Sequence, residues 1–278
     1  AMRFTVGPPH DGGGLLSVFK LMRVVFLLSI LFGIVASTWI TEKRMAAWDR
    51  PILVTVHPIA ADQNPATLKY ARNVDSDTFD AVNRFFGVQS RPYGFEVTPA
   101  FRFQVAPVEA GLPPPVPGQF DFAAIAWWSL KMRWWALRRE MSDGLIRPDI
   151  QMFLLLHGDG GNDEMGISVG MRKGRYGIVK AYATESARST NLVVFTHELM
   201  HVLGATDKYT ISTGEPLYPH GFADPDQEPL FPQRRAEIMG GRIPLSAFSS
   251  IMPGSLEQCK IGRLTAEEIG FLDKLKLL

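Results

Sequence analysis

An uncharged, apolar run near the start of the chain separates a short N-terminal segment from the rest of the sequence. It extends over 17 residues from Val24 to Ile40, which is the lower limit for a helix that crosses a bilayer. Trp39 lies near its end, where an interfacial aromatic residue is typical. A helix in a globular core rarely continues this far without a polar face. We therefore interpret the run as a transmembrane anchor. A cleaved signal peptide is the alternative, because Val35-Ala36-Ser37 offers a plausible cleavage site.

This interpretation divides the chain into three parts. Residues 1–20 begin with a Gly- and Pro-rich sequence and are expected to form a disordered tail. Residues 21–41 are the transmembrane or signal segment, and residues 45–278 are expected to form a single domain. Basic residues are equally frequent on the two sides of the run, so the positive-inside rule does not orient it. We place the domain outside the cytoplasm, on a single-pass membrane protein, because N-terminal anchors of this kind usually export the domain attached to them. Cleavage would make the protein secreted.

The composition excludes several classes of protein. The chain has 278 residues, of which 29 are basic, 28 are acidic and 46% are hydrophobic, which is too apolar and too weakly charged for intrinsic disorder. Nucleic acid is not expected as a partner, because phosphate binding requires clustered Lys and Arg. The single cysteine, Cys259, excludes an intrachain disulfide and a CxxC-type zinc or redox motif.

Hydrophobic periodicity predicts strands that alternate with helices through most of the domain. The expected strands are Ile52–Pro58, Phe95–Ala106, Ile150–Leu156 and Gly177–Ala183, and the expected helices are Ser76–Val88, Ala123–Met141, Thr190–Leu203 and Leu264–Leu277. Asp75 or Ser76 is expected to cap the first of these helices and Thr265 the last. This order of elements indicates an α+β or mixed α/β class.

One helix carries a pattern that is typical of a metal site. His197 and His201 are four residues apart, so both imidazoles project from the same face and can bind one ion. Glu198 lies beside the first histidine and can reach a water on that ion without binding the ion itself. Catalytic zinc generally has three protein ligands. Gly204 can end the helix in a left-handed conformation, which would turn Asp207 back toward the metal as the third ligand.

This pattern resembles the metzincin clan of zinc metallopeptidases, whose long motif is HExxHxxGxxH. The third position here holds Asp207, as in the snapalysin-like form HExxHxxGxxD, and Tyr209 matches the Asp-x-Tyr of that branch. Metzincins also have a methionine in a tight turn. Glu237-Ile238-Met239-Gly240-Gly241 matches the snapalysin type of turn, so we favour Met239 over Met252, which lies in the competing segment Ser250–Pro253.

The resemblance implies a fold and a chemistry. It implies a twisted sheet above the active-site helix and a catalytic Zn²⁺ bound by His197, His201 and Asp207. Glu198 would be the general base, and the substrate would be a protein or peptide. Tyr209 would either stabilise the oxyanion or serve only as a packing tyrosine. The strand Gly177–Ala183 would be the edge strand that holds an extended peptide.

The resemblance is limited to residues 190–209 and about 237–241. The 29 residues between Tyr209 and Met239 form a longer connection than snapalysins have, and residues 41–150 do not match. A zinc hydrolase of a non-protein substrate and a catalytically inactive binding module are therefore alternatives to a peptidase. The intact Glu198 argues against the inactive module, which has no need of a base there.

Two further segments have alternative interpretations. Trp127, Trp128, Trp134 and Trp135 lie in pairs seven residues apart, with basic residues between them. They form either an interfacial helix on a membrane or an aromatic stripe facing the core, and we favour the core. Residues 157–164 are acidic and glycine-rich and form either a calcium site or a solvated turn, of which we favour the turn. His157 and His220 are alternative metal ligands.

Overall fold

The structure is a computed structural model of the whole chain. It describes residues 13–94, 96–108, 111–115, 117, 122–158, 168–171 and 175–272. The chain divides into two compact units, Ala1–Lys43 and Arg44–Leu278. Most of the acidic, glycine-rich segment considered as a calcium site or a turn lies outside the described residues.

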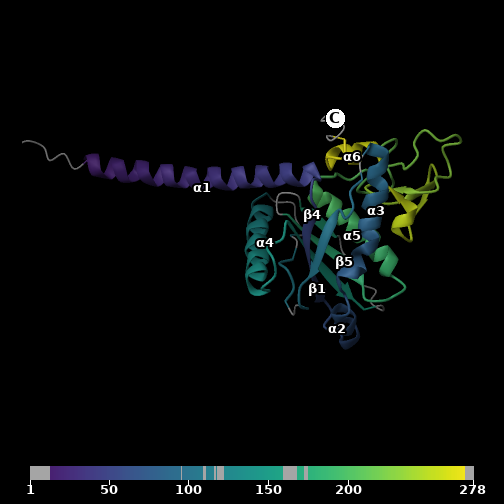
Figure 1. Cartoon of the computed structure of the whole chain (residues 1–278), viewed down its shortest axis with the longest axis horizontal. Helices are drawn as coiled ribbons and strands as arrows, with labels where there is room; N and C mark the ends of the chain where they lie inside the picture. Colours follow the sequence, from purple (N-terminus) through teal and green to yellow (C-terminus); the bar gives the residue numbers. More distant parts are fainter. Residues whose placement is uncertain are drawn as a thin grey trace, which may run out of the picture. The chain divides into compact units, whose positions relative to one another are not determined.

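The first unit contains most of a long helix, α1 (Gly13–Ala47) (Figure 1). The apolar run lies within α1, and its large side chains, such as Phe26 and Phe32, are exposed. Because α1 begins at Gly13, the expectation of a tail through residue 20 is wrong for residues 13–20, which are helical. Among the described residues, no helix combines the length and the apolar character that a membrane span requires.

The second unit is built around a five-stranded sheet with the order β2-β1-β3-β5-β4. Its strands are β1 (Ile52–Ala60), β2 (Phe101–Val105), β3 (Ile150–His157), β4 (Val169–Met171) and β5 (Tyr176–Tyr182). All neighbours are parallel except β4, which pairs with β5 in the antiparallel direction. The interior strands are nearly continuous runs of buried apolar residues, which is typical of parallel strands covered on both faces. The mixed α/β class is therefore confirmed.

Helices cover both faces of this sheet. The two faces of β3 show the division, because Met152 and Leu154 pack in one core cluster and Phe153 and Leu155 in another. The first cluster contains residues of α2 (Pro65–Arg72), α3 (Asp80–Ser90) and α5 (Arg188–Leu203), and the second contains residues of α4 (Phe122–Ser142). Figure 1 shows α4 on one side of the strands and α3 and α5 on the other.

The tryptophans of α4 do not share one environment. Trp128 is buried in the second core cluster, and Trp135 packs against that cluster. Trp127 and Trp134 are exposed instead. The expectation of one aromatic stripe facing the core is therefore wrong for one tryptophan of each pair, because adjacent residues on a helix project about 100° apart.

Short elements come after α5 in the chain. The strands β6 (Ala236–Glu237) and β9 (Cys259–Lys260) form one small parallel sheet, and β7 (Ile243–Ser246) and β8 (Ser249–Ile251) form an antiparallel pair. The last helix described is α6 (Arg263–Glu268). Three short 3-10 helices, Ser76–Phe79, Arg91–Tyr93 and Leu256–Gln258, complete the regular structure described.

Most of the predicted elements are confirmed, with three differences. The strand expected over residues 95–106 covers only Phe101–Val105; Pro99 precedes it and has no N–H for a ladder. The helix expected over residues 76–88 begins as the 3-10 turn Ser76–Phe79, which Asp75 caps as predicted. The helix expected over residues 264–277 ends at Glu268, and residues 273–278 lie outside the described part.

The predicted edge strand is also wrong. The segment Gly177–Ala183 corresponds to β5, which lies between β3 and β4 and has neighbours on both sides. The edge next to it is β4, which has only three residues and contains Gly170. So short a strand leaves no period-2 signal in the sequence, so periodicity cannot find it.

Candidate metal centre

The helix α5 carries both histidines of the motif and packs against the edge strand β4. Its buried residues include Leu199 and Val202, which pack in the first core cluster, while His197 and His201 are partly exposed. The helix ends at Gly204, whose φ of 117° lies in the left-handed region, as the sequence predicted. The N–H of Ala205 donates to the Met200 carbonyl at 2.9 Å, which closes the helix end and reverses the chain.

This reversal brings Asp207 to the two histidines. Asp207 Oδ1 lies 3.2 Å from His197 Nε2 and 3.1 Å from His201 Nε2, and the two Nε2 atoms are 3.1 Å apart. A tetrahedral zinc site with Zn–N bonds of about 2.0–2.1 Å would separate its ligand atoms by roughly 3.3–3.4 Å. Three ligand atoms thus converge at nearly the spacing of a zinc site. Among the described residues, this is the one group of its kind.

Backbone carbonyls hold both imidazoles in the tautomer that a metal needs. His197 Nδ1 donates to the Ile238 carbonyl and His201 Nδ1 to the Ala205 carbonyl, each at 2.9 Å. With a proton on each Nδ1, a bound cation would replace the Nε2 proton and meet both Nε2 lone pairs at the shared point; without a cation, the Nε2–H groups donate to Asp207. Such an outer hydrogen bond is typical of histidines that bind metals.

Asp207 and His201 shift each other's pKa values within the cluster. Burial by itself would raise the pKa of Asp207, but hydrogen bonds from His197 and His201 hold that pKa well below its usual value. Burial lowers the pKa of His201, but the hydrogen bond and the charge of Asp207 outweigh burial and raise it. Asp207 is therefore an anionic ligand, which suits a divalent cation.

Glu198 lies beside the cluster on the same helix. It is buried, and burial raises the pKa of its carboxyl group. The Gly170 N–H donates a hydrogen bond to this carboxylate. Its Oε2 is buried and has no hydrogen-bond partner among the described residues. A buried carboxylate oxygen without a partner is costly unless a water or ligand binds it. The donor set and this free oxygen both fit a metal ion with a bound water.

Tyr209 lies at the same cluster. Its ring centroid is 6.2 Å from that of His197, and its hydroxyl donates a hydrogen bond to Asp207. Burial and the negative charge of Asp207 raise the pKa of Tyr209 to about 12. Tyr209 therefore contacts Asp207, one of the three candidate ligands.

The two candidate methionines have different surroundings. Met239 is fully buried in the turn after β6, next to the Ile238 carbonyl that accepts from His197. Met252 is 47% exposed and lines a cavity of about 190 Å³ beside His197, together with Val193 and Tyr209. The turn that contains Met239 is thus the one bonded to a candidate ligand.

Glu237 organises this turn, and sequence reasoning assigned it no role. It is fully buried, and its carboxylate accepts from the Met239, Gly240 and Gly262 N–H groups and the Thr265 hydroxyl, at 2.7–3.0 Å. Burial raises the pKa of Glu237 above its usual value, and these hydrogen bonds offset only part of that increase. The bond from Thr265 corrects the prediction that this residue caps the last helix: α6 begins at Arg263, and Thr265 lies inside it.

A second group that the sequence did not indicate supports the loop carrying Asp207. Glu268, at the end of α6, accepts from the Thr206 N–H at 3.0 Å and from Lys208 Nζ at 2.7 Å. Lys208 is 4% exposed, and its backbone N–H donates to the Met239 carbonyl at 2.9 Å. The residues on both sides of Asp207 are thereby tied to separate parts of the fold.

The other residues considered as ligands do not join the cluster. His157 lies at the end of β3, and His220 is exposed in the long connection before β6. Neither belongs to the group of ligand atoms formed by His197, His201 and Asp207.

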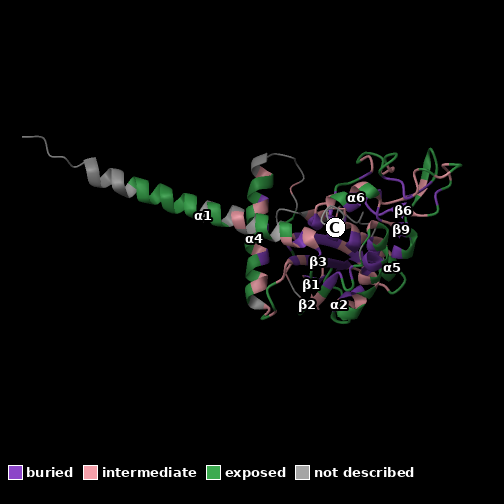
Figure 2. Cartoon of the chain, turned by 45° about the horizontal axis from the view of Figure 1, so that its top comes forward, coloured by how far each residue is buried: buried purple, intermediate pink, exposed green. Residues whose placement is uncertain are grey.

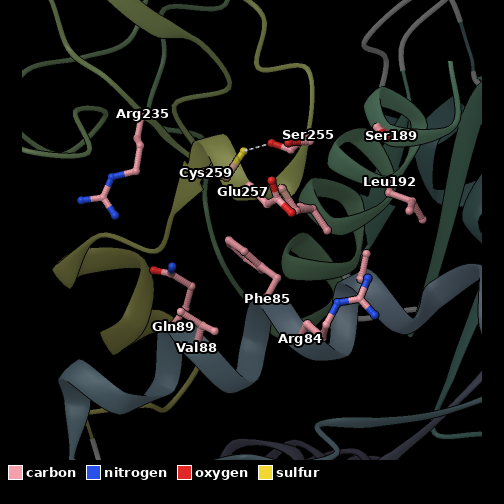
Figure 3. Close-up of a pocket in the computed structure, with 12 residues that line it drawn as sticks. Arg84, Phe85, Val88, Gln89, Ser189, Leu192, Arg235, Ser255, Glu257 and Cys259 are labelled. Atoms are coloured by element: carbon pink, nitrogen blue, oxygen red, sulfur yellow. Dashed lines mark hydrogen bonds between the residues drawn. The ribbon is translucent and has the colours of Figure 1, made fainter. Parts of the chain in front are cut away.

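A further cavity is separate from these ligands. It has a volume of about 530 Å³ and is lined by α3, by the first turns of α5 and by the segment around Leu256 (Figure 3). Cys259 lies in its wall, where its Sγ donates to the Ser255 carbonyl at 3.6 Å. Burial, with the nearby charge of Glu237, raises the pKa of Cys259 to about 12, so its thiol is unreactive at neutral pH.

Comparison with models of known protein families finds no family that matches this chain, and comparison with curated proteins finds no match either. The functional assignment therefore depends on the geometry of the site.

Proposed function

We propose that the chain is a membrane-anchored zinc metallopeptidase of the metzincin type, whose domain of residues 45–278 hydrolyses peptide bonds outside the cytoplasm. The observation that carries this proposal is the convergence of His197, His201 and Asp207 next to Glu198 Oε2, which has no hydrogen-bond partner in the described part of the chain. A zinc ion bound by these three ligands would lower the pKa of a water and polarise a carbonyl group.

Glu198 is the one residue that carries a proton in this mechanism. Glu198 takes a proton from the attacking water and delivers it to the nitrogen of the leaving amine, which balances the hydrolysis. Its raised pKa suits this exchange, because a base that is buried near the reaction holds and releases a proton more readily at neutral pH. We assign Tyr209 to stabilising the oxyanion, which requires its hydroxyl to exchange Asp207 for the substrate oxygen.

The peptide as substrate is supported by the position of the edge strand. The strand β4 forms the edge of the sheet, and its Gly170 lies against Glu198 and His201 of α5. An extended peptide that adds to the free side of β4 would form a further strand beside the candidate ligands. We propose β4 for this role in place of β5. We likewise propose Met239 as the methionine of the turn characteristic of metzincins.

The first test measures zinc in the purified full chain by elemental analysis. We expect about one zinc per chain in the wild type and in the His220→Ala control, and loss of zinc in His201→Ala. His220 is the matched control because it is an exposed histidine outside the cluster. A folded wild-type chain that takes up no zinc would overturn the metal centre.

The second test separates chemistry from metal binding. Glu198→Gln should keep its zinc and lose hydrolysis of fluorescein-labelled casein by roughly 10²–10⁴-fold. Cleavage by this variant at the wild-type rate would contradict the role of Glu198. If the zinc-loaded wild type cleaves neither casein nor a mixed peptide library, the metal centre stands but the assignment as a peptidase is wrong.

A further inference from the structure

The helix α4 is apolar on two opposite sides. Its inner side packs on the sheet through Trp128, Met132 and Ala136, which are at most 6% exposed. Its outer face consists of large apolar residues spaced alternately three and four positions apart, which are 39–77% exposed: Trp127, Leu130, Trp134, Leu137 and Met141. Figure 2 shows exposed residues along much of this helix. A helix on the surface of a soluble domain normally has a polar outer side.

The charges on this helix are mostly positive. The helix contains four basic residues and one acidic residue, Glu140, whose carboxylate is bonded to Arg147 and Gln151. Lys131 Nζ lies 5.3 Å from the ring centroid of Trp127, and the Arg138 guanidinium lies 5.9 Å from that of Trp134. The outer face therefore combines exposed tryptophans with cationic groups held directly beside them. Tryptophan and long basic side chains together are typical of the headgroup region of a bilayer.

The inner side keeps α4 attached to the domain. Trp128 Nε1 donates to the Pro114 carbonyl at 2.9 Å, and Trp135 packs against Phe153 of β3. The helix has 21 residues, which corresponds to a length of about 30 Å. Because its inner side is held by the sheet, α4 can meet a partner only by its side chains and along its length. A flat surface satisfies this condition.

Charge decides between the two occupants that such a stripe could have. The alternating spacing of three and four would also suit a coiled-coil seam with a second copy of this chain. A second copy would place Lys131 and Arg138 against the same cations, and the one acidic residue of α4, Glu140, is already bonded to Arg147 and Gln151. An anionic bilayer accepts both the tryptophans and the cations.

We propose that the outer face of α4 lies in the headgroup region of an anionic lipid bilayer and holds the domain against the membrane surface. This interaction is independent of the proposed peptidase activity, since none of its residues belongs to the metal cluster.

The test uses a nitroxide spin label on the full chain, reconstituted with vesicles. The label is attached at Leu130→Cys on the outer face. The control is Val88→Cys on α3, because Val88 is an apolar residue of similar exposure, 53% against 58%. Native Cys259 stays in place, because it is buried and its raised pKa keeps it from labelling. The measurement is the accessibility of each label to oxygen relative to a water-soluble nickel chelate.

With vesicles of phosphatidylglycerol and phosphatidylcholine, we expect a several-fold higher oxygen-to-nickel ratio at position 130 than at position 88. The ratio at position 130 should fall to that of the control with phosphatidylcholine alone, and also when Lys131→Glu and Arg138→Glu are combined. Equal ratios at both positions with anionic vesicles would overturn the proposal. So would an unchanged ratio after charge reversal, or dipolar coupling between the labels of two copies.

Discussion

Glu237 illustrates how a single buried carboxylate positions part of the candidate site. It accepts four hydrogen bonds from three separate points of the chain, at residues 239–240, 262 and 265. The turn that these bonds hold includes Ile238, whose carbonyl orients His197. A residue without contact to the ligand atoms therefore determines where one of them points.

Replacing Glu237 by alanine should be strongly destabilising. The change leaves several buried donors without an acceptor, each at a cost of about 1–3 kcal/mol, so we expect a loss of about 3 kcal/mol or more in the free energy of unfolding. Urea unfolding of the full chain measures this loss. Glu267→Ala is the control, because Glu267 is exposed in α6 and should change stability by less than about 0.5 kcal/mol. A loss of similar size in both variants would contradict this account of Glu237.

At the scale of elements, the contact between β4 and α5 determines how close the sheet edge comes to the site. An added Cβ at Gly170 would overlap the Glu198 carbonyl oxygen and lie 2.5 Å from His201 Cβ. Only a glycine allows the two backbones to approach this closely. This contact also supplies the N–H that bonds the Glu198 carboxylate.

The variant Gly170→Ala should therefore separate β4 from the helix. We expect a loss of about 1–3 kcal/mol in stability, as for other overpacked sites, together with weaker zinc binding in a competition titration. The matched control is Gly254→Ala, where an added Cβ would meet only the end of the flexible Gln258 side chain, at 3.4 Å. Unchanged zinc affinity in Gly170→Ala would show that β4 does not position the ligands.

Element prediction from the sequence succeeded where a segment has its own periodicity. The strands β1, β3 and β5 and the helices α4 and α5 are long enough to show a pattern, and their positions are confirmed. The strand β4 and the two-residue strands β6 and β9 are too short for one, and only their pairing, β4 with β5 and β6 with β9, defines them. The wrong edge strand was a consequence of the missing β4.

At the scale of the whole molecule, the far face of the sheet contains a buried histidine that opposes acid stability. His57 of β1 is 1% exposed and stacks on Phe153 with ring centroids 4.7 Å apart. Burial and the charge of Arg139 lower the pKa of His57 to about 4, although its Nδ1 lies 3.3 Å from Asp143 Oδ2. In the unfolded chain its pKa is the ordinary 6.5. The unfolded state therefore binds this proton first as the pH falls.

The stability of the fold should consequently decrease between pH 6.5 and pH 4 through this residue and level off below. The pKa difference corresponds to about 3 kcal/mol at most. Urea unfolding at both ends of this range should show a larger acid-induced loss in the wild type than in His57→Gln, whose side chain does not titrate. The carboxylates contribute equally to both proteins, so an identical loss in the two would contradict the role of His57.

The sequence by itself determined the parts of the site that depend on local geometry. The four-residue spacing places His197 and His201 on one face of a helix, and Gly204 ends that helix so that Asp207 can return. The tertiary structure decided what holds these ligands. The bond from His197 joins residues 41 apart, and the bond between Lys208 and Glu268 joins residues 60 apart. The tertiary structure also decided which tryptophans of α4 face outward. Helical geometry repeats every few residues and can be read along the chain, whereas these contacts exist only once distant segments have packed together.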